Sequence, residues 1–418
     1  MRIDGWTKGG ESPPASHFNA LTGDKMRNRI RYPLALSTVV IACAIAFPAQ
    51  AVDWGGYFRA GPGATKKDAS RACYGLDGPG LKYRLGNECD FYGEFLLSQG
   101  FKADGVEYKA NLMTNLWNGA TDTGDSKLGI AQMFVEGKGY DFAPDVSFWV
   151  GKRYYARQDV HIVDTHYTDL SGVGAGADGI SLGGPTLSLA WFRTDAAANQ
   201  SGNRINADVH GIDTNPGGKL RVTGTFTHSA FTGGENGVGL GLLHSQDNFL
   251  GLGGGNTFWL QYAQGSAGLN GNFGNLAAPS SNKSWRVIES LTWQMGPLGG
   301  QAQVMFQQDK SAGLKVNSAT IGGRASYAIT NNLKFLAEAG YSQKKPDNGS
   351  TQKLAKLTLG PALTTGPGFW NRPELRLYVT HAKWNAAANA AAGAGGVTGI
   401  GDGRTKGTSY GAQAEMWF

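Results

Sequence analysis

The sequence predicts an all-β fold, on three observations. Of the 418 residues, 64 are glycine, 17% are charged and 11% are aromatic, which is typical of a chain with many turns. After Val52 no apolar run reaches the roughly 18 residues that a membrane-spanning helix needs. Instead, apolar and polar residues alternate over segments of about 7 to 12 residues between Gly, Asn and Asp clusters, a pattern that indicates meandering antiparallel strands.

The chain begins with an export signal. Met26 opens a segment with arginines at 27, 29 and 31, an apolar run follows over residues 33–47, and Ala49-Gln50-Ala51 is a small-residue cleavage site. We therefore expect residues 26–51 to be a signal peptide that is removed before Val52. Residues 1–25 have no place in such a signal, and we expect an extension or an over-called start.

The mature chain keeps two of the three cysteines. Cys43 lies in the apolar part of the signal, which leaves Cys73 and Cys89. An exported chain reaches an oxidising compartment, so a disulfide between them is expected. Two buried free thiols are the alternative.

The alternating segments have one polar and one apolar face. At the C-terminus Gln413, Glu415 and Trp417 share one face, and Ala414, Met416 and Phe418 share the other. A soluble sandwich would show the same alternation. The export signal, unequal connections, aromatics on the polar face and a terminal aromatic favour an outer-membrane barrel that is apolar outside.

The clearest segments are 90–99, 106–117, 219–228, 256–264, 285–295, 333–342, 353–359, 374–384 and 407–418. Weaker ones bring the count to about eighteen, and such a barrel encloses an aqueous channel.

One loop is unusually rich in functional groups. Residues 151–176 hold two arginines, three aspartates, two histidines and three tyrosines between a strand and a Gly-rich exit. Long loops of this kind are usually functional, and in a barrel this one would fold inward to narrow the lumen. A metal site formed by His161, Asp164 and His166, or a hydrolase that uses Asp159 and Asp164, are the alternatives. Neither set has a recognised spacing, so we expect no enzyme and no cofactor.

Two strands place a ring beside a charge on one face. Tyr57 lies two residues from Arg59, and Tyr92 two residues from Glu94. This pairing suits sugars, whose C–H faces rest on rings while their hydroxyls bond to charged groups. An aromatic girdle on the lipid side is the alternative. The formal charge of +6 lies partly in residues 1–51, so nucleic acid is not indicated.

Several separated blocks resemble the maltoporin family of sugar-specific porins in Gram-negative outer membranes. They are 52–59, 82–94, 151–176, 370–373, 382–384 and 411–418. The resemblance implies an 18-stranded homotrimeric barrel with an inward-folded third loop, and an aromatic slide beside a polar track. Slide positions fall on Tyr57, Tyr92, Trp370 and Trp417, with Trp117 contributed from a neighbouring subunit. Track and constriction positions fall on Arg59, Arg84, Glu94, Arg157, Asp159, His161, Asp164, His166 and Asn256. The pair Cys73 and Cys89 coincides with the family's first-loop disulfide.

Three departures bear on specificity. The family's constriction tyrosine is His166 here, its mid-slide phenylalanine falls on Gly255, and one track arginine falls near Ala131. The mature chain is short for the family, so trimmed outer loops are expected.

The expected function is facilitated diffusion of saccharides, such as maltose and maltodextrins, and of ions. Expected partners are the saccharide, outer-membrane lipid and lipopolysaccharide. A general porin with a degenerate slide, an outer-membrane enzyme, or a surface receptor, for example for phage, are the alternatives.

Overall fold

A computed structural model describes residues 52–65, 72–119, 126–197 and 200–418. The expected signal peptide and extension over residues 1–51 lie outside the described residues. Within the described part, no helix is long and apolar enough to cross a membrane. The fold is almost entirely β-sheet, as predicted.

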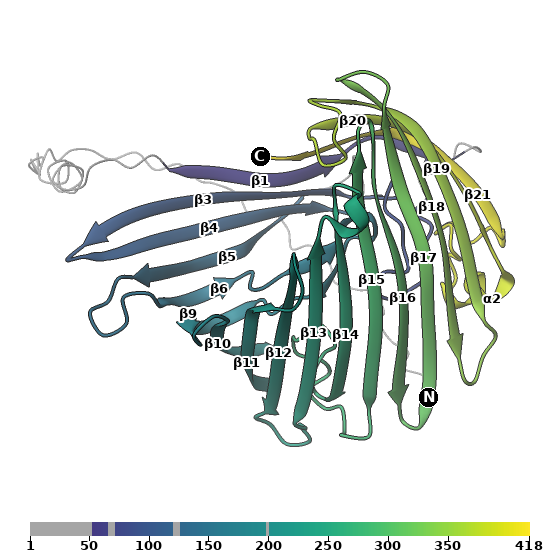
Figure 1. Ribbon diagram of the computed structural model, residues 1–418. Helices are drawn as coiled ribbons and strands as arrows, with labels where there is room; N and C mark the ends of the chain where they lie inside the picture. Colours follow the sequence, from purple (N-terminus) through teal and green to yellow (C-terminus); the bar gives the residue numbers. More distant parts are fainter. Residues whose placement is uncertain (1–51, 66–71, 120–125, 198–199) are drawn as a thin grey trace, which may run out of the picture. The chain divides into compact units, whose positions relative to one another are not determined.

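The strands form one closed antiparallel barrel, in which each strand pairs with its neighbours in sequence and β1 pairs with both β3 and β21 (Figure 1). The sheet has 19 strands, and because β1 and β2 both pair with β21 they act as one interrupted strand, which leaves eighteen. The predicted strand number is confirmed. The strands are β1 (Asp53–Ala60), β2 (Gly63–Thr65), β3 (Phe91–Ala103), β4 (Val106–Asn118), β5 (Lys127–Lys138), β6 (Ser147–Arg153), β9 (Gly172–Ser181), β10 (Thr186–Ala197), β11 (Gln200–Asp213), β12 (Gly218–Ser229), β13 (Gly237–Asp247), β14 (Gly255–Gly265), β15 (Lys283–Met295), β16 (Leu298–Ser311), β17 (Leu314–Ala328), β18 (Leu333–Pro346), β19 (Gln352–Thr364), β20 (Glu374–Trp384) and β21 (Lys406–Trp417).

Polarity is inverted relative to a soluble protein. Along β20 the buried side chains of Glu374 and Arg376 alternate with Leu375 and Leu377, which are 56% and 61% exposed. Charged groups therefore line the lumen and apolar groups face outward, the arrangement required where lipid surrounds a closed barrel. The predicted faces of β20 and β21 are confirmed.

The two rims of the barrel differ. The rim that holds Asp53 and Phe418, here called the terminal rim, has mostly short turns, such as the one between β15 and β16. The opposite rim, here called the loop rim, carries the connections that contain residues 72–90, 154–171, 266–282 and 385–405. The last of these includes the helix α2 (Ala386–Ala391).

The third loop, residues 154–171, crosses the lumen as predicted. It contains β7 (Gln158–Val160), the short helix η1 (His161–Val163) and β8 (Thr165–Thr168). The backbone N–H of Ile162 donates to Oε1 of Gln301 at 3.2 Å, and the Tyr167 hydroxyl donates to Oε1 of Gln303 at 3.1 Å. Both acceptors lie on β16, so the loop rests on the opposite wall.

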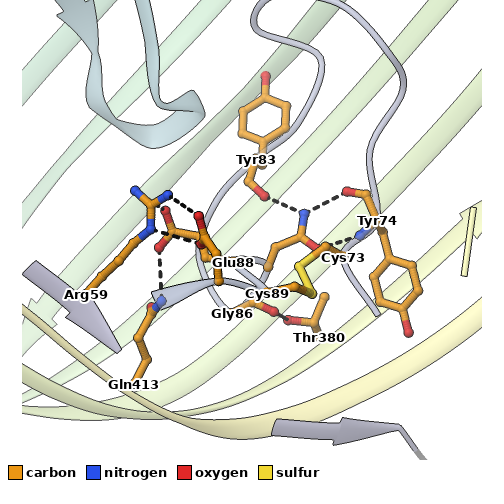
Figure 2. Close-up of a disulfide and its surroundings, with 11 residues drawn as sticks. Arg59, Cys73, Tyr74, Tyr83, Gly86, Glu88, Cys89, Thr380 and Gln413 are labelled. Atoms are coloured by element: carbon orange, nitrogen blue, oxygen red, sulfur yellow. Dashed lines mark hydrogen bonds and ion pairs between the residues drawn. A yellow bond between two sulfur atoms is a disulfide. The ribbon is translucent and has the colours of Figure 1, made fainter. Parts of the chain in front are cut away.

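The first loop, residues 72–90, also folds inward, which the sequence did not predict. The backbone N–H of Leu85 donates to Oε1 of Glu338 on β18 at 2.8 Å. The Tyr83 ring lies against Gly322 and Gly340, where a Cβ atom would overlap it. The predicted disulfide between Cys73 and Cys89 is present and closes this loop (Figure 2). Buried side chains of both loops pack against the wall as one apolar core, which includes Tyr74, Leu81, Tyr83, Ile162 and Tyr167.

Candidate functional site

The barrel seam brings the predicted ring and charge pairs together. Tyr57 lies directly opposite Trp417 on β21 and opposite Glu94 on β3, and Arg59 lies opposite Glu415 and Tyr92. Directly opposite residues share a face of the sheet. All six side chains therefore point into the lumen.

Aromatic rings follow this seam from one rim to the other. Tyr57 and Tyr92 have ring centroids 6.3 Å apart, and Trp370 and Trp417 are also 6.3 Å apart. Trp117 lies opposite Tyr92, and its Nε1 donates to Oδ2 of Asp90 at 3.2 Å. The structure thus gathers all five predicted slide residues within one chain. A contribution of Trp117 from a neighbouring subunit stays a prediction.

Two guanidinium groups share their carboxylates beside these rings. Arg59 lies 3.2 Å from Glu88 and 3.0 Å from Asp164. Arg84 lies 2.7 Å from Glu88, 3.1 Å from Glu415 and 3.6 Å from Asp164. Figure 2 shows Arg59 and Glu88 next to the disulfide. The predicted track residues Arg59, Arg84 and Asp164 therefore belong to one connected ion-pair network.

Asp164 is the accessible member of this network. It follows η1 in the left-handed region (φ 51°, ψ 46°), and its side chain is 42% exposed. Burial by itself would raise the pKa of Asp164, but the nearby Arg84 and Arg59 guanidinium groups lower it to about 2. The carboxylate is therefore charged at neutral pH and open to the lumen.

A second polar group lies on the other side of the third loop. The Tyr154 hydroxyl donates to Oε1 of Glu94 at 2.7 Å, and the Arg157 guanidinium lies 3.9 Å from the centre of the Tyr154 ring. Nη2 of Arg157 is 3.2 Å from Nδ1 of His166. His166 on β8 lies directly opposite the exposed Asp159 on β7. Burial, and then the adjacent Arg157, lower the pKa of His166. His166 is therefore neutral at pH 7.

His161 is buried between the ion-pair network and the rings of Trp370 and Trp417. Its Nδ1 lies 3.2 Å from Nη1 of Arg84, and its Nε2 lies 3.7 Å from Oε2 of Glu415. The imidazole is 5.4 Å from the Trp370 ring and 5.6 Å from the Trp417 ring. Both ring nitrogens face side chains, and over the described ranges no group of three or more His, Cys, Asp or Glu residues is arranged to hold a metal ion.

Sequence reasoning missed several charged residues that complete the network. Glu415 accepts from Arg372 at 3.0 Å and also contacts Arg376, while Asp90 lies 3.1 Å from Arg59. The signal was present for Glu415, which shares the face of Trp417. Arg372 and Asp90 belong to turns and loops, where no period-two pattern marks the inner side.

The structure does not bring Asn256 to the polar track, and this placement corrects the prediction. Alternation along β14 puts Asn256 on the face of Phe258 and Leu260, which are 36% and 41% exposed. There it donates a hydrogen bond to Glu289. Adjacent positions of a strand point to opposite faces, so a residue on the outer face of β14 cannot line the lumen.

A cavity of about 770 Å³ lies beside the two inward-folded loops. Its lining includes Lys82 and Arg84 from the first loop, Asp164 and His166 from the third loop, and Arg286 from β15. The cavity is therefore a polar chamber bounded by both inward-folded loops and by β15.

A closed barrel with an apolar exterior, a charged lumen and an inward-folded loop is the architecture of an outer-membrane porin. The LamB porin family model matches residues 52–418, and the chain belongs to this family. It is therefore a channel of the Gram-negative outer membrane and not an enzyme.

Solved structures with a similar course of the chain share little sequence with it. Pseudomonas aeruginosa OccD3 (OpdP) matches with a TM-score of 0.47 and 10% identity, over 89% of this chain and 92% of that one. P. aeruginosa OpdK with vanillate matches with a TM-score of 0.46 and 10% identity, over 88% and 98%. Vibrio cholerae OmpT in its trimer form matches with a TM-score of 0.42 and 10% identity, over 88% and 99%. At such scores these structures carry no conclusion about substrate or assembly.

Proposed function

We propose that the protein is a channel for facilitated diffusion of short saccharides, maltose and related oligosaccharides among them. The observation that carries the proposal is the row of lumen aromatics Trp117, Tyr92, Tyr57, Trp417 and Trp370 beside the ion-pair network of Arg59, Arg84 and Asp164. Aromatic faces suit the C–H faces of a pyranose, and charged groups suit its hydroxyls.

Transport in this proposal follows from weak serial contacts. A sugar exchanges one ring for the next along the seam while its hydroxyls exchange partners along the network. Each contact has to be favourable enough for the sugar to enter and weak enough for it to leave. No covalent step or energy input is needed.

The departures from the family favour short substrates. His166 stands at the constriction in place of the expected tyrosine, and its imidazole is held beside Arg157 rather than presented as a free face. Gly255 supplies no ring in mid-slide. Each stacking contact that is lost costs about 1 kcal/mol, so long maltodextrins lose more than maltose does.

The test is single-channel conductance in planar bilayers. We expect maltose, maltotriose and sucrose at millimolar concentration to interrupt the ion current, with maltotriose binding no more than about tenfold tighter than maltose. If none of the three sugars changes the current, the sugar proposal fails and a general porin with a degenerate slide is the better description.

We also propose that the barrel is a homotrimer. An apolar groove of about 520 Å³ on the outer surface of β3–β6, lined by Leu97, Leu112, Met133, Val135 and Val150, supports a subunit contact. Chemical cross-linking in native outer membranes should give a ladder that ends at three subunits. A single-subunit band under the same conditions would count against assembly.

A further inference from the structure

Seven consecutive strands each carry one outward-facing lysine within two residues of the loop rim. These residues, here called the lysine belt, are Lys283 of β15, Lys310 of β16, Lys315 of β17, Lys345 of β18, Lys353 of β19, Lys383 of β20 and Lys406 of β21. All seven are exposed, and within the described residues none of them forms an ion pair with a carboxylate.

The belt faces outward and not into the channel. Lys283 shares the face of Trp285, Lys310 that of Phe306, and Lys345 that of Tyr341, and these rings are 38%, 39% and 39% exposed. The rings lie two or four residues from their lysines, which is about 7 to 13 Å along a strand. Outward aromatic rings of this kind mark the membrane interface. The ammonium groups therefore lie at the level of the lipid headgroups.

Like charges in the belt are direct neighbours. Lys310 lies opposite both Lys283 and Lys315, and Lys383 lies opposite Lys406. Directly opposed like charges destabilise a sheet, so the arrangement needs an anion to offset the repulsion. Other outward cations near this rim have partners: Lys152 donates to the carbonyl oxygen of Ile130 at 2.5 Å, and Arg193 donates to Oδ1 of Asn203 at 3.3 Å.

The rim identifies the leaflet. Outer-membrane barrels have short periplasmic turns and longer extracellular loops, so the loop rim lies in the outer leaflet. We propose that the lysine belt is a binding site for the phosphate groups of lipopolysaccharide. Adjacent strands are about 4.8 Å apart, which lets two or three ammonium groups surround one phosphate. The aromatic rings below would contact the glycolipid's sugar and acyl chains.

The test compares two triple variants of the full-length protein. K283Q/K310Q/K315Q removes three adjacent belt charges. K102Q/K138Q/K219Q removes three exposed lysines from the terminal rim, two of which pair with Glu107 and Asp213, and controls for the loss of positive charge alone. Binding of purified lipopolysaccharide, bisphosphorylated lipid A and dephosphorylated lipid A is measured on each refolded barrel. Heat-modifiable migration on gels shows that each variant is folded, and K283R/K310R/K315R serves as a charge-preserving variant.

The wild type should prefer bisphosphorylated over dephosphorylated lipid A at least tenfold. The belt variant should lose about tenfold in affinity, whereas the control and the arginine variant should stay within about twofold. Equal binding by the belt variant, equal loss in the control, or equal affinity for dephosphorylated lipid A would overturn the proposal. So would displacement by inorganic phosphate at the concentration of the lipid. Sugar block of the current is measured separately, because this site does not depend on the saccharide proposal.

Discussion

Arg59 and Asp164 meet in the lumen: Nη1 of Arg59 on β1 lies 3.0 Å from Oδ2 of Asp164 in the third loop. The two residues are 105 positions apart in sequence. Arg84 of the first loop lies 3.6 Å from the other oxygen of the same carboxylate. One side chain thus joins the wall and both inward-folded loops.

Asp164→Asn should alter both selectivity and sugar binding. The amide keeps the shape but leaves the positive charges of Arg59 and Arg84 less balanced, so the ratio of cation to anion permeability should fall about threefold. Because the carboxylate is partly exposed, sugar block should weaken only about fivefold, or about 1 kcal/mol. Reversal potentials in a salt gradient measure the first effect. Asp213→Asn at the terminal rim is the control, and an unchanged reversal potential in D164N would contradict the prediction.

Ion selectivity should change at a lower pH than an ordinary imidazole would produce. Burial and Arg157 keep the pKa of His166 below the ordinary imidazole value, so the midpoint of its protonation lies below about pH 6.5. The Asp164 pKa of about 2 lies below its ordinary value. The stabilisation from its ion pairs is therefore fully present above about pH 4 and is lost as the pH falls toward 2.

The measurement is the reversal potential between pH 8 and pH 4. The shift toward anion permeability should have its midpoint below about pH 6.5 and should be absent in His166→Asn. A midpoint at the ordinary imidazole value in the wild type, removed by that substitution, would be the contrary result.

His166→Tyr should tighten the binding of maltodextrins. The phenol ring adds a stacking face at the constriction, and the imidazole contact with Arg157 is lost. A gain of about 1 kcal/mol corresponds to about a fivefold lower concentration for half-block by maltotriose. Unchanged or weaker block would argue against a constriction role for this position. His166→Phe separates the contribution of the ring from that of the hydroxyl.

Trp370→Ala should weaken sugar binding without loss of the barrel. The ring is 44% exposed in the lumen and lies in the turn before β20, beside Trp417. Loss of one stacking contact predicts about a fivefold weaker block by maltotriose. Trp191→Ala removes a ring of similar exposure, 48%, from the outer face and should leave block unchanged. Equal effects of both substitutions would refute the slide.

Cys73→Ser combined with Cys89→Ser should loosen the first loop. The bridge spans 16 residues, and its removal costs about 3 kcal/mol in the chain-entropy model. The strands do not depend on it, so heat-modifiable migration should persist while open-channel current becomes noisier. Current noise with and without reductant tests this effect in the wild type. A quiet channel in the double variant would mean that contacts such as Leu85 with Glu338 hold the loop alone.

Most of the fold could be predicted from the sequence, because successive side chains of a strand point to opposite faces of the sheet. Glu374 and Leu375, or Glu415 and Met416, alternate so regularly that the inner and outer sides of β20 and β21 can be predicted directly. The family resemblance, and not this rule, assigned Asn256 to the track, and the alternation along β14 contradicts that assignment. The first loop was not predicted to fold inward, because its contacts, such as Leu85 with Glu338 253 residues away, leave no local pattern. Contacts between residues far apart in sequence, such as Arg372 with Glu415, were missed for the same reason.

The seam between β1 and β21 has a consequence for biogenesis. The Tyr57 hydroxyl donates to Oε1 of Glu415 at 3.1 Å, although the two residues are 358 positions apart. Until the last strand is in place, β1 and β20 both present unpaired backbone edges, which lipid does not tolerate. The barrel therefore closes only with the complete chain, because β21 pairs with both β1 and β20. A premature stop codon that removes only this strand would yield a misassembled polypeptide for periplasmic proteases rather than a leaky pore.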